Sequence, residues 1–388
     1  MKIYFNLLIT LLFFFSSNGF NQEFIKVGLF TSSKISLIEL KGNEISYFVK
    51  ADNYSFFIPE NSEIQISSST NRVNLSSGSF NLGVFQKIEI DIGNNQGVVL
   101  KPLKPNYPEN KYTEKLLISS YQGKLTIVNK LTKENYVVGV LRGEIGFDKP
   151  FNSYLVMAIL AQTYAEGYNS RHRSEGFNLC DQTHCQVFKG YFDYKPYHDA
   201  AYLSKNKIIL DANRNIIEGL FHSNCGGITQ KSGDVWKNNL NYCVSVIDSF
   251  CINERNSKWS KTFSLYDFYL KLNLPYEEDS AKHFDYCNNI VSINDNRQKE
   301  ITINNRKINT VFMRAQLNLK SDWFDVKCQN DSIVINGRGF GHGVGLCQEG
   351  CIAMAKQGCN EEEIINFYFK DVIIEDKKKS NAIINLLK

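Results

Sequence analysis

The sequence has no strong net charge, no long hydrophobic run beyond residue 20 and none of the commonest catalytic motifs. No segment after that point approaches the ~18 uninterrupted apolar residues of a membrane-spanning helix. The 44 basic and 40 acidic side chains leave a formal net charge of only +4, so the composition does not favour nucleic-acid binding. The motifs H-E-x-x-H and G-x-S-x-G and the protein-kinase signature are absent, which argues against the enzyme classes that they mark.

A short apolar run does occur at the N-terminus. Lys2 precedes the apolar stretch 7–15, and small or polar residues follow at 16–19. This order is typical of a secretory signal peptide, and no cysteine follows the run to carry a lipid. We therefore expect a signal peptide at residues 1–20, cleaved between about Ser17 and Gln22, and a soluble protein exported to the periplasm, cell wall or extracellular space. An uncleaved anchor is the alternative interpretation.

The remaining composition indicates a folded α+β protein. Apolar residues make up 43% of the chain and aromatic residues 13%, which is enough for a hydrophobic core. Apolar and polar residues alternate at 24–97, as in short strands, whereas helical spacing follows Thr132 and Pro150. We expect a β-rich part at 24–110, a mixed part at 111–375 and a tail at 376–388. Within the mixed part, strands are expected at 216–229 and 306–319, and a helix at 280–290.

Glycine occupies every second position from Gly337 to Gly345, which is the side-chain period of an extended chain. Neither the dinucleotide fingerprint nor the phosphate-binding loop fits this spacing. One face of such a chain is bare backbone, and the side chains between the glycines, including Arg338 and His342, share the other. Two interpretations stay open. The bare face binds a flat polar ligand closely, or it packs tightly against another strand.

The ten cysteines are too few for a disulfide scaffold in a chain of 388 residues, although an oxidising compartment permits some pairs. His172, Cys180 and Cys185 lie close together in sequence and have the donor types of a zinc site. His184 and Cys185 point in opposite directions on an extended chain, so they are not expected to share an ion. A turn after Cys180 would let His184 replace His172. The competing interpretations are a disulfide from Cys225 to Cys180 or Cys185, and buried thiols.

Glu144 directly follows an expected helix, where a solvated glutamate is common. Six segments nevertheless resemble, in order, the motifs of the SpoIID/LytB family of cell-wall proteins across roughly residues 26–375. They are VVGVLRGEI, VMAILAQTYAEGY, EGFNLCDQTHCQVFKG, FHSNCGGIT, RAQLNLKSDWFDV and GRGFGHGVGLCQEGCIAMAKQG. The chain departs from the family pattern at Gln162, where the family has arginine, and at Cys351, where it has alanine. Cys347 lies four residues before Cys351, a spacing that suits a disulfide poorly.

The resemblance implies a peptidoglycan lytic transglycosylase that cuts MurNAc–GlcNAc linkages in strands stripped of peptide stems. The resemblance also implies that residues 111–375 form a SpoIID-type catalytic domain. This domain would have a glycine-lined glycan groove, with Glu144 as the single general acid/base. Some family members bind zinc beside the groove, so one structural zinc ion is expected in the loop from His172 to Cys185. The substrate-binding residues that it implies are Arg338, Gly339, Gly341, His342, Gly343 and Gln348.

Two other functions remain open. Family members have also been described as amidase enhancers, which would make the chain a non-catalytic glycan-binding partner of an N-acetylmuramoyl-L-alanine amidase. A hydrolase would need a second carboxylate, for which Asp148, Asp181 and Asp234 are candidates. A transglycosylase needs one acid, because the muramoyl 6-hydroxyl is the internal nucleophile. The sequence does not distinguish sporulation, division and general wall turnover.

Overall fold

The computed structural model describes residues 24–42, 44–277, 286–287, 290–291, 297–329 and 332–377. The expected signal peptide, most of the expected helix at 280–290 and the tail beyond residue 377 lie outside the described residues. Within the described part of the chain, no helix is both long and apolar enough to cross a membrane.

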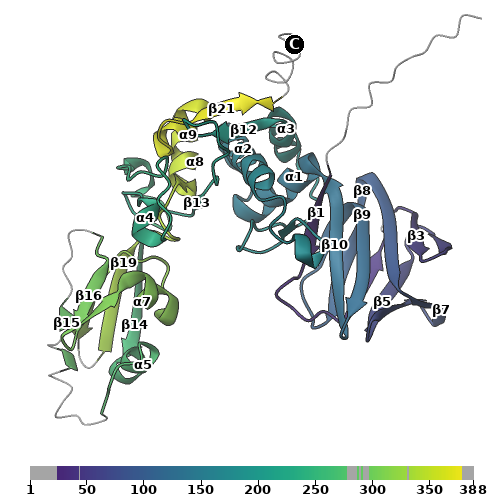
Figure 1. Ribbon diagram of the computed structural model, residues 1–388, viewed down its shortest axis with the longest axis horizontal. Helices are drawn as coiled ribbons and strands as arrows, with labels where there is room; N and C mark the ends of the chain where they lie inside the picture. The colour runs from purple at the N-terminus through teal and green to yellow at the C-terminus, as the bar shows by residue number, and fades with distance from the viewer. Residues whose placement is uncertain are drawn as a thin grey trace, which may run out of the picture.

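Strands β1 to β10 and the later strand β11 form an 11-stranded sheet in the order β11-β1-β10-β9-β8-β2-β5-β6-β7, with β3 paired to β8 and β4 to β3 (Figure 1). Alternate residues are buried, as Ile64 and Ile66 are in β5. The sheet continues to Thr132, so strands on both sides of residue 110 belong to one sheet. Its strands are β1 (Phe24–Leu29), β2 (Leu37–Lys41), β3 (Tyr47–Ala51), β4 (Tyr54–Ile58), β5 (Glu63–Ser69), β6 (Arg72–Ser77), β7 (Phe80–Phe85), β8 (Lys87–Lys104), β9 (Asn110–Tyr121), β10 (Lys124–Thr132) and β11 (Leu179–Cys180).

Helices α1 (Lys133–Glu144), α2 (Phe151–Gly167) and α3 (Lys195–Leu203) follow the sheet and pack on one another. Thr132 caps α1 by accepting a hydrogen bond from the Asn135 N–H, and Pro150 precedes α2, as the spacing predicts. Because α2 is buried on nearly all sides, it forms the centre of the main hydrophobic core. The short helix η1 (Arg173–Glu175) leads into β11.

The C-terminal elements join the same core, because α8 and α9 both contact α2. The expected strand at 216–229 is reduced to the two residues of β13, which pair in parallel with β20. The other two-stranded sheet pairs β12 with β21. These elements are β12 (Lys207–Leu210), β13 (Phe221–His222), α4 (Ser232–Val235), η2 (Ser249–Cys251), β20 (Leu346–Cys347), α8 (Gln348–Lys356), α9 (Glu361–Tyr368) and β21 (Ile373–Asp376).

A smaller unit has its own hydrophobic core and lies at the end of the molecule away from the large sheet (Figure 1). The disulfide Cys287–Cys328 lies in this unit. Its elements are β14 (Lys258–Ser264), α5 (Leu265–Lys271), β15 (Ile290–Val291), β16 (Glu300–Ile303), β17 (Arg306–Asn309), α7 (Thr310–Leu317), β18 (Phe324–Gln329) and β19 (Ser332–Arg338). The mixture of a large sheet, helices and small sheets confirms the α+β class.

The expectation of strand across 306–319 is wrong for its second half, where α7 begins. The Asn309 side chain caps this helix by accepting hydrogen bonds from the N–H groups of Val311 at 2.9 Å and Phe312 at 3.1 Å. Met313 and Leu317 are buried one helical turn apart, so the apolar spacing suits a helix. The cap and the packing together override the β-branched residues that favour a strand.

Candidate functional site

Glu144 is the last residue of α1 and is held by a backbone contact. Gly146, at a φ of 71°, ends the helix and donates its N–H to the Leu141 carbonyl at 3.4 Å. The Glu144 side chain accepts a hydrogen bond from the Val187 N–H, with 2.6 Å between Oε1 and N. Glu144 is therefore partly buried and fixed in position, unlike a solvated glutamate at a helix end.

This environment favours the protonated carboxyl group. Burial raises the pKa of Glu144 above its ordinary value, while the Val187 N–H and the charge of Lys189 act in the opposite direction. The end of α1 opposes ionisation as well, because the C-terminus of a helix carries partial negative charge. A glutamate that keeps its proton at higher pH is suited to general acid catalysis.

Two glycines of α1 allow residues 187–189 to approach this helix closely. A Cβ atom on Gly139 would overlap the Phe188 ring, and one on Gly143 would overlap the Val187 carbonyl. The Lys189 N–H reaches the Gly139 carbonyl at 3.1 Å. The i, i+4 spacing of these glycines, which places both on one helix face, is the sequence signal by which this contact could have been predicted.

Gly143→Ala should disturb Glu144 without removing it. The added methyl group has to displace Val187, so we expect a loss of about 1–3 kcal/mol in the free energy of unfolding, as for other overpacked sites. Gly167→Ala is the matched control, because its methyl group would meet only Ile216 at 3.5 Å. Denaturant unfolding of both variants measures the difference. Equal stability of the two variants would show that the close contact at Val187 is absent.

Gln348 brings the C-terminal motif to Glu144. It is the first residue of α8, and its Nε2 donates to the Glu144 carbonyl at 3.3 Å. His342 lies in the same motif, and its Nδ1 accepts a hydrogen bond from the Val344 N–H at 3.1 Å. Burial, with smaller effects from nearby arginines, lowers the pKa of His342 to about 4, so its ring is neutral at pH 7.

The His342 ring also contacts two aromatic side chains. The His222 ring lies 5.6 Å away in an edge-on arrangement, and the Trp236 ring lies 5.0 Å away. Arg338 is exposed, with its guanidinium 5.2 Å from the Trp323 ring centre. Sequence reasoning missed both tryptophans, because neither lies in the glycine motif.

The alternating glycines do not form a regular strand. β19 ends at Arg338, and Gly339, Gly341, Gly343 and Gly345 all have positive φ angles, from 72° to 116°. The prediction of an extended chain is therefore wrong after Arg338, because four left-handed residues interrupt it. Cβ atoms on Gly339, Gly341 and Gly345 would overlap residues of the segment 220–226. These close contacts agree with the interpretation that the glycines allow tight packing against another segment. A role in glycan binding for these residues stays a prediction.

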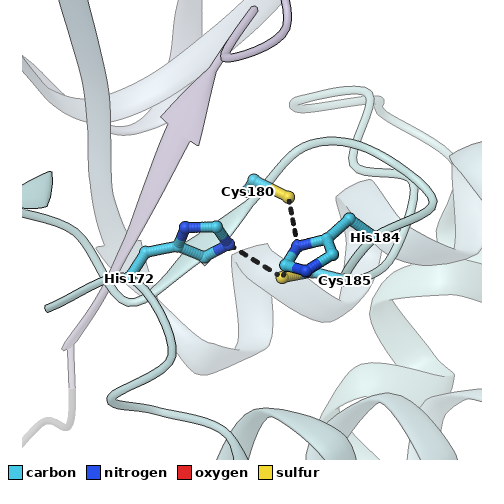
Figure 2. Close-up of side chains that lie close together, drawn as sticks. All are labelled: His172, Cys180, His184 and Cys185. Carbon is cyan, nitrogen blue, oxygen red and sulfur yellow. Dashed lines mark hydrogen bonds between the residues drawn. The ribbon is translucent and has the colours of Figure 1, made fainter.

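His172, Cys180, His184 and Cys185 converge in space (Figure 2). Their donor atoms all lie within 4.8 Å of one another. The Cys185 Sγ lies 3.5 Å from Nε2 of His172 and 3.8 Å from Nδ1 of His184. The Cys180 Sγ also lies 3.8 Å from Nδ1 of His184.

Two expectations about this cluster are corrected. His184 and Cys185 were expected to point apart, but a turn in which the Cys185 N–H donates to the Gln182 carbonyl at 2.9 Å lets both side chains join the cluster. Cys225, the other alternate ligand, lies elsewhere, with its Sγ 3.3 Å from that of Cys251. Cys180 and Cys185 are free thiols. The structure therefore gives no support to a disulfide between either of them and Cys225.

The donor set fits zinc in type and in spacing. Ordinary Zn–S and Zn–N bond lengths place sulfur and nitrogen ligands of a tetrahedral ion about 3.6 Å apart, close to the distances in this cluster. The Nδ1 of His172 lies 2.5 Å from a Glu175 carboxylate oxygen, the usual outer partner of a metal-binding histidine. Metal binding by Nδ1 of His184 would put a proton on Nε2, so Arg171, now 3.2 Å from that atom, would have to turn away.

The loop that leaves the cluster leads directly to Glu144. Gln186 follows Cys185, and its Oε1 accepts a hydrogen bond from the Tyr136 hydroxyl of α1 at 2.8 Å. Val187 comes next and donates to Glu144. Three successive residues thus connect the metal-type cluster, the helix and the acid. Sequence reasoning missed the hydrogen bond between Tyr136 and Gln186 and also the Val187 N–H, which as a backbone donor leaves no sequence signal.

The other candidate carboxylates have different surroundings. Asp181 accepts a hydrogen bond from the Phe30 N–H at 2.7 Å. Asp234 pairs with Lys299 at 2.6 Å and lines a cavity of about 240 Å³ whose lining includes neither Glu144 nor Gln348. Asp148 is exposed, four residues after Glu144. Asp181 and Asp234 therefore have structural partners of their own.

Comparisons with known proteins agree with the motifs. The family model described as SpoIID, stage II sporulation protein, matches residues 121–213. An uncharacterized protein of Brachyspira hyodysenteriae is 26% identical over 377 residues, which cover 93% of this chain and 95% of that protein. The stage II sporulation protein D of Bacillus subtilis is 28% identical over 64% of this chain and 76% of its own length. The amidase enhancer of Bacillus subtilis is 26% identical over 59% of this chain, which spans 39% of that protein. Together with the six ordered motifs, these matches show that the chain is similar to proteins of the SpoIID/LytB family.

Proposed function

We propose that this chain is an exported, peptidoglycan-active lytic transglycosylase in which Glu144 is the single general acid/base. The observation that carries the proposal is the environment of Glu144, which is partly buried, has a raised pKa and is fixed by the Val187 N–H. Similarity to proteins of the SpoIID/LytB family supports a peptidoglycan-related function. The N-terminal pattern and the disulfide Cys287–Cys328 support export.

In the proposed reaction, protonated Glu144 donates its proton to the glycosidic oxygen between MurNAc and GlcNAc. The bond from C1 of MurNAc to this oxygen breaks, and positive charge develops at C1. The muramoyl 6-hydroxyl then attacks C1, while the Glu144 carboxylate accepts the hydroxyl proton. The products are a 1,6-anhydromuramoyl end and a free GlcNAc 4-hydroxyl, and Glu144 regains its proton.

The glycan would lie along the C-terminal motif beside Glu144. Gln348 contacts the Glu144 carbonyl and supplies amide groups for a sugar hydroxyl. The neutral His342 ring would contribute an uncharged aromatic surface, and exposed Arg338 offers cationic donors. The backbone of the glycine motif would contribute through Gly339, Gly341 and Gly343.

The residues His172, Cys180, His184 and Cys185 would hold a structural zinc ion, which supplies rigidity to the loop. This loop positions the Val187 N–H and so aims the Glu144 carboxyl group. No step of the reaction needs a metal-activated water.

The second candidate function is that of a non-catalytic, glycan-binding partner of an N-acetylmuramoyl-L-alanine amidase. The likeness to a Bacillus subtilis protein named amidase enhancer favours it. The same residues of the C-terminal motif would then bind glycan without cleaving it.

Digestion of purified glycan strands without peptide stems separates these functions. The proposed enzyme yields 1,6-anhydromuramoyl ends, which mass spectrometry identifies as muramic ends that lack one water. Reducing ends would instead show a hydrolase with a second acid. Glycan binding without any cleavage would support the amidase-enhancer function.

The pH dependence of cleavage should follow the raised pKa of Glu144. The acid step needs the protonated carboxyl group, so the rate should fall as the pH rises through this pKa. Lys189→Met removes a charge that lowers the pKa of Glu144, so the alkaline limb of the rate profile should move to higher pH. Lys195→Met, at an exposed lysine of α3, is the control and should leave the limb in place. An unmoved limb in Lys189→Met would argue against Glu144 as the titrating group.

A further inference from the structure

A second group of metal-binding side chains lies apart from the site described above. Cys225 follows β13, Asp248 and Cys251 belong to η2 and its cap, and Cys347 ends β20. Their donor atoms lie within 4.8 Å of one another, and all four residues are 0% exposed. We propose that these three thiolates and one carboxylate bind a second ion, a divalent metal of the zinc class.

The spacing of the donors approaches that of a tetrahedral site. The Cys225 Sγ lies 3.3 Å from the Cys251 Sγ and 3.2 Å from Asp248 Oδ2. Ordinary Zn–S and Zn–O bond lengths put such ligand pairs about 3.8 and 3.5 Å apart. The two pairs therefore need to separate by only about 0.5 Å or less to accept an ion. Sulfur donors in this number favour zinc over magnesium or calcium.

Outer contacts hold the donors in place, as they do around metal ligands. The Tyr368 hydroxyl donates to Asp248 Oδ2 at 2.9 Å. The N–H groups of Cys225 and Gly350 both lie 3.4 Å from the Cys347 Sγ, where they would stabilise a thiolate. These hydrogen bonds thus orient the Asp248 carboxylate and the Cys347 sulfur before any ion binds.

Asp248 is a fully buried carboxyl group. An ionised carboxylate that is fully buried is costly unless a positive charge or a metal accompanies it. Among the described residues, no ion pair is found for Asp248; its carboxyl group contacts the Cys225 and Cys347 thiols, the Tyr368 hydroxyl and the Phe250 N–H, and its burial raises its pKa. A divalent ion bound by Asp248 and the thiolates would balance this charge.

A disulfide between Cys225 and Cys251 accounts for fewer of the observations. Their Sγ atoms lie 3.3 Å apart, beyond the ~2.05 Å of a covalent S–S bond. Such a bond would use two of the four donors and leave Cys347 and Asp248 buried beside it. A metal ion uses all four, which come from three separate parts of the chain.

The second ion would stabilise the part of the fold that carries Gln348. Cys347 directly precedes Gln348, and the Glu349 N–H donates to the Ser223 carbonyl at 3.0 Å. An ion bound by Cys225 and Cys347 would therefore tie the segment after β13 to the start of α8. This inference does not depend on catalysis and holds equally for a glycan-binding protein.

The test is the number of zinc ions per chain, measured by native mass spectrometry and elemental analysis of the full chain. We expect two ions in the wild-type protein and one in Cys251→Ser, with the ion at His172 retained. Cys180→Ser should lose the other ion and keep this one. The matched control is Cys359→Ser, because Cys359 is a free cysteine outside both clusters, and it should keep two ions. With cobalt(II) in place of zinc, the ion retained in Cys180→Ser should show the stronger absorption of three thiolates.

Asp248→Asn tests the site if Cys251→Ser does not fold. The amide keeps the shape and removes the charge, so the second ion should be lost at a lower chelator concentration than in the wild type. The proposal is overturned if the wild-type protein holds one ion that depends only on Cys180. It is also overturned if the unreduced, denatured chain contains a Cys225–Cys251 bond, identified by peptide mapping.

Discussion

Glu144→Gln is expected to lower the rate of glycan cleavage by about 10²–10⁴-fold and to leave glycan binding nearly unchanged. The amide keeps the shape of the side chain and can still accept the Val187 N–H, but it cannot donate the proton that the leaving oxygen needs. Cleavage kinetics and glycan binding, measured on the same strands, separate these effects. Glu134→Gln, in the first turn of the same helix, is the control and should keep wild-type turnover.

The unfolding free energy of Glu144→Gln, measured against pH, tests whether unfolding causes any loss of activity. Because burial raises the pKa of Glu144 in the folded state, the protonated carboxyl adds stability at low pH that is lost as the pH rises through this pKa. The variant should therefore gain stability relative to the wild type as the pH rises above about 4.5. Near wild-type cleavage by the variant would remove Glu144 from the mechanism.

Cys185→Ser should abolish zinc binding at the proposed site formed by His172, Cys180, His184 and Cys185, and should lower activity indirectly. Loss of a structural metal is among the most destabilising of single changes, so we expect more than about 4 kcal/mol of lost unfolding free energy. Cleavage should fall as well, because Cys185 lies two residues before the N–H that fixes Glu144. Metal content, thermal unfolding and cleavage are measured together, with Cys359→Ser as the control.

A milder change tests the same proposed site. Glu175→Gln keeps all four proposed ligands and alters only the partner of His172 Nδ1, so zinc affinity should fall about 10–100-fold. Competition with a chelator measures the change. A wild-type protein that contains no zinc and retains free Cys180 and Cys185 would contradict the metal site.

The sequence by itself determined those features that depend on a few neighbouring residues. The start of α1 at Thr132 and the start of α2 after Pro150 follow from cap residues and apolar spacing within one or two turns. Three of the four clustered Cys and His side chains were predicted from donor type and proximity in sequence. The strand prediction across α7 failed because the cap at Asn309 and the burial of Met313 outweighed strand propensity.

Only the tertiary structure decided how these residues meet. His184 joins the first cluster through a turn that the neighbour rule for extended chains does not anticipate. The Val187 N–H reaches Glu144 because α1 presents glycine at the contact, and Gln348 reaches it from 204 residues along the chain. The second cluster gathers donors from three segments that no spacing connects. Local caps act within a few residues, whereas donor geometry depends on how distant segments pack, and no short stretch of sequence contains that information.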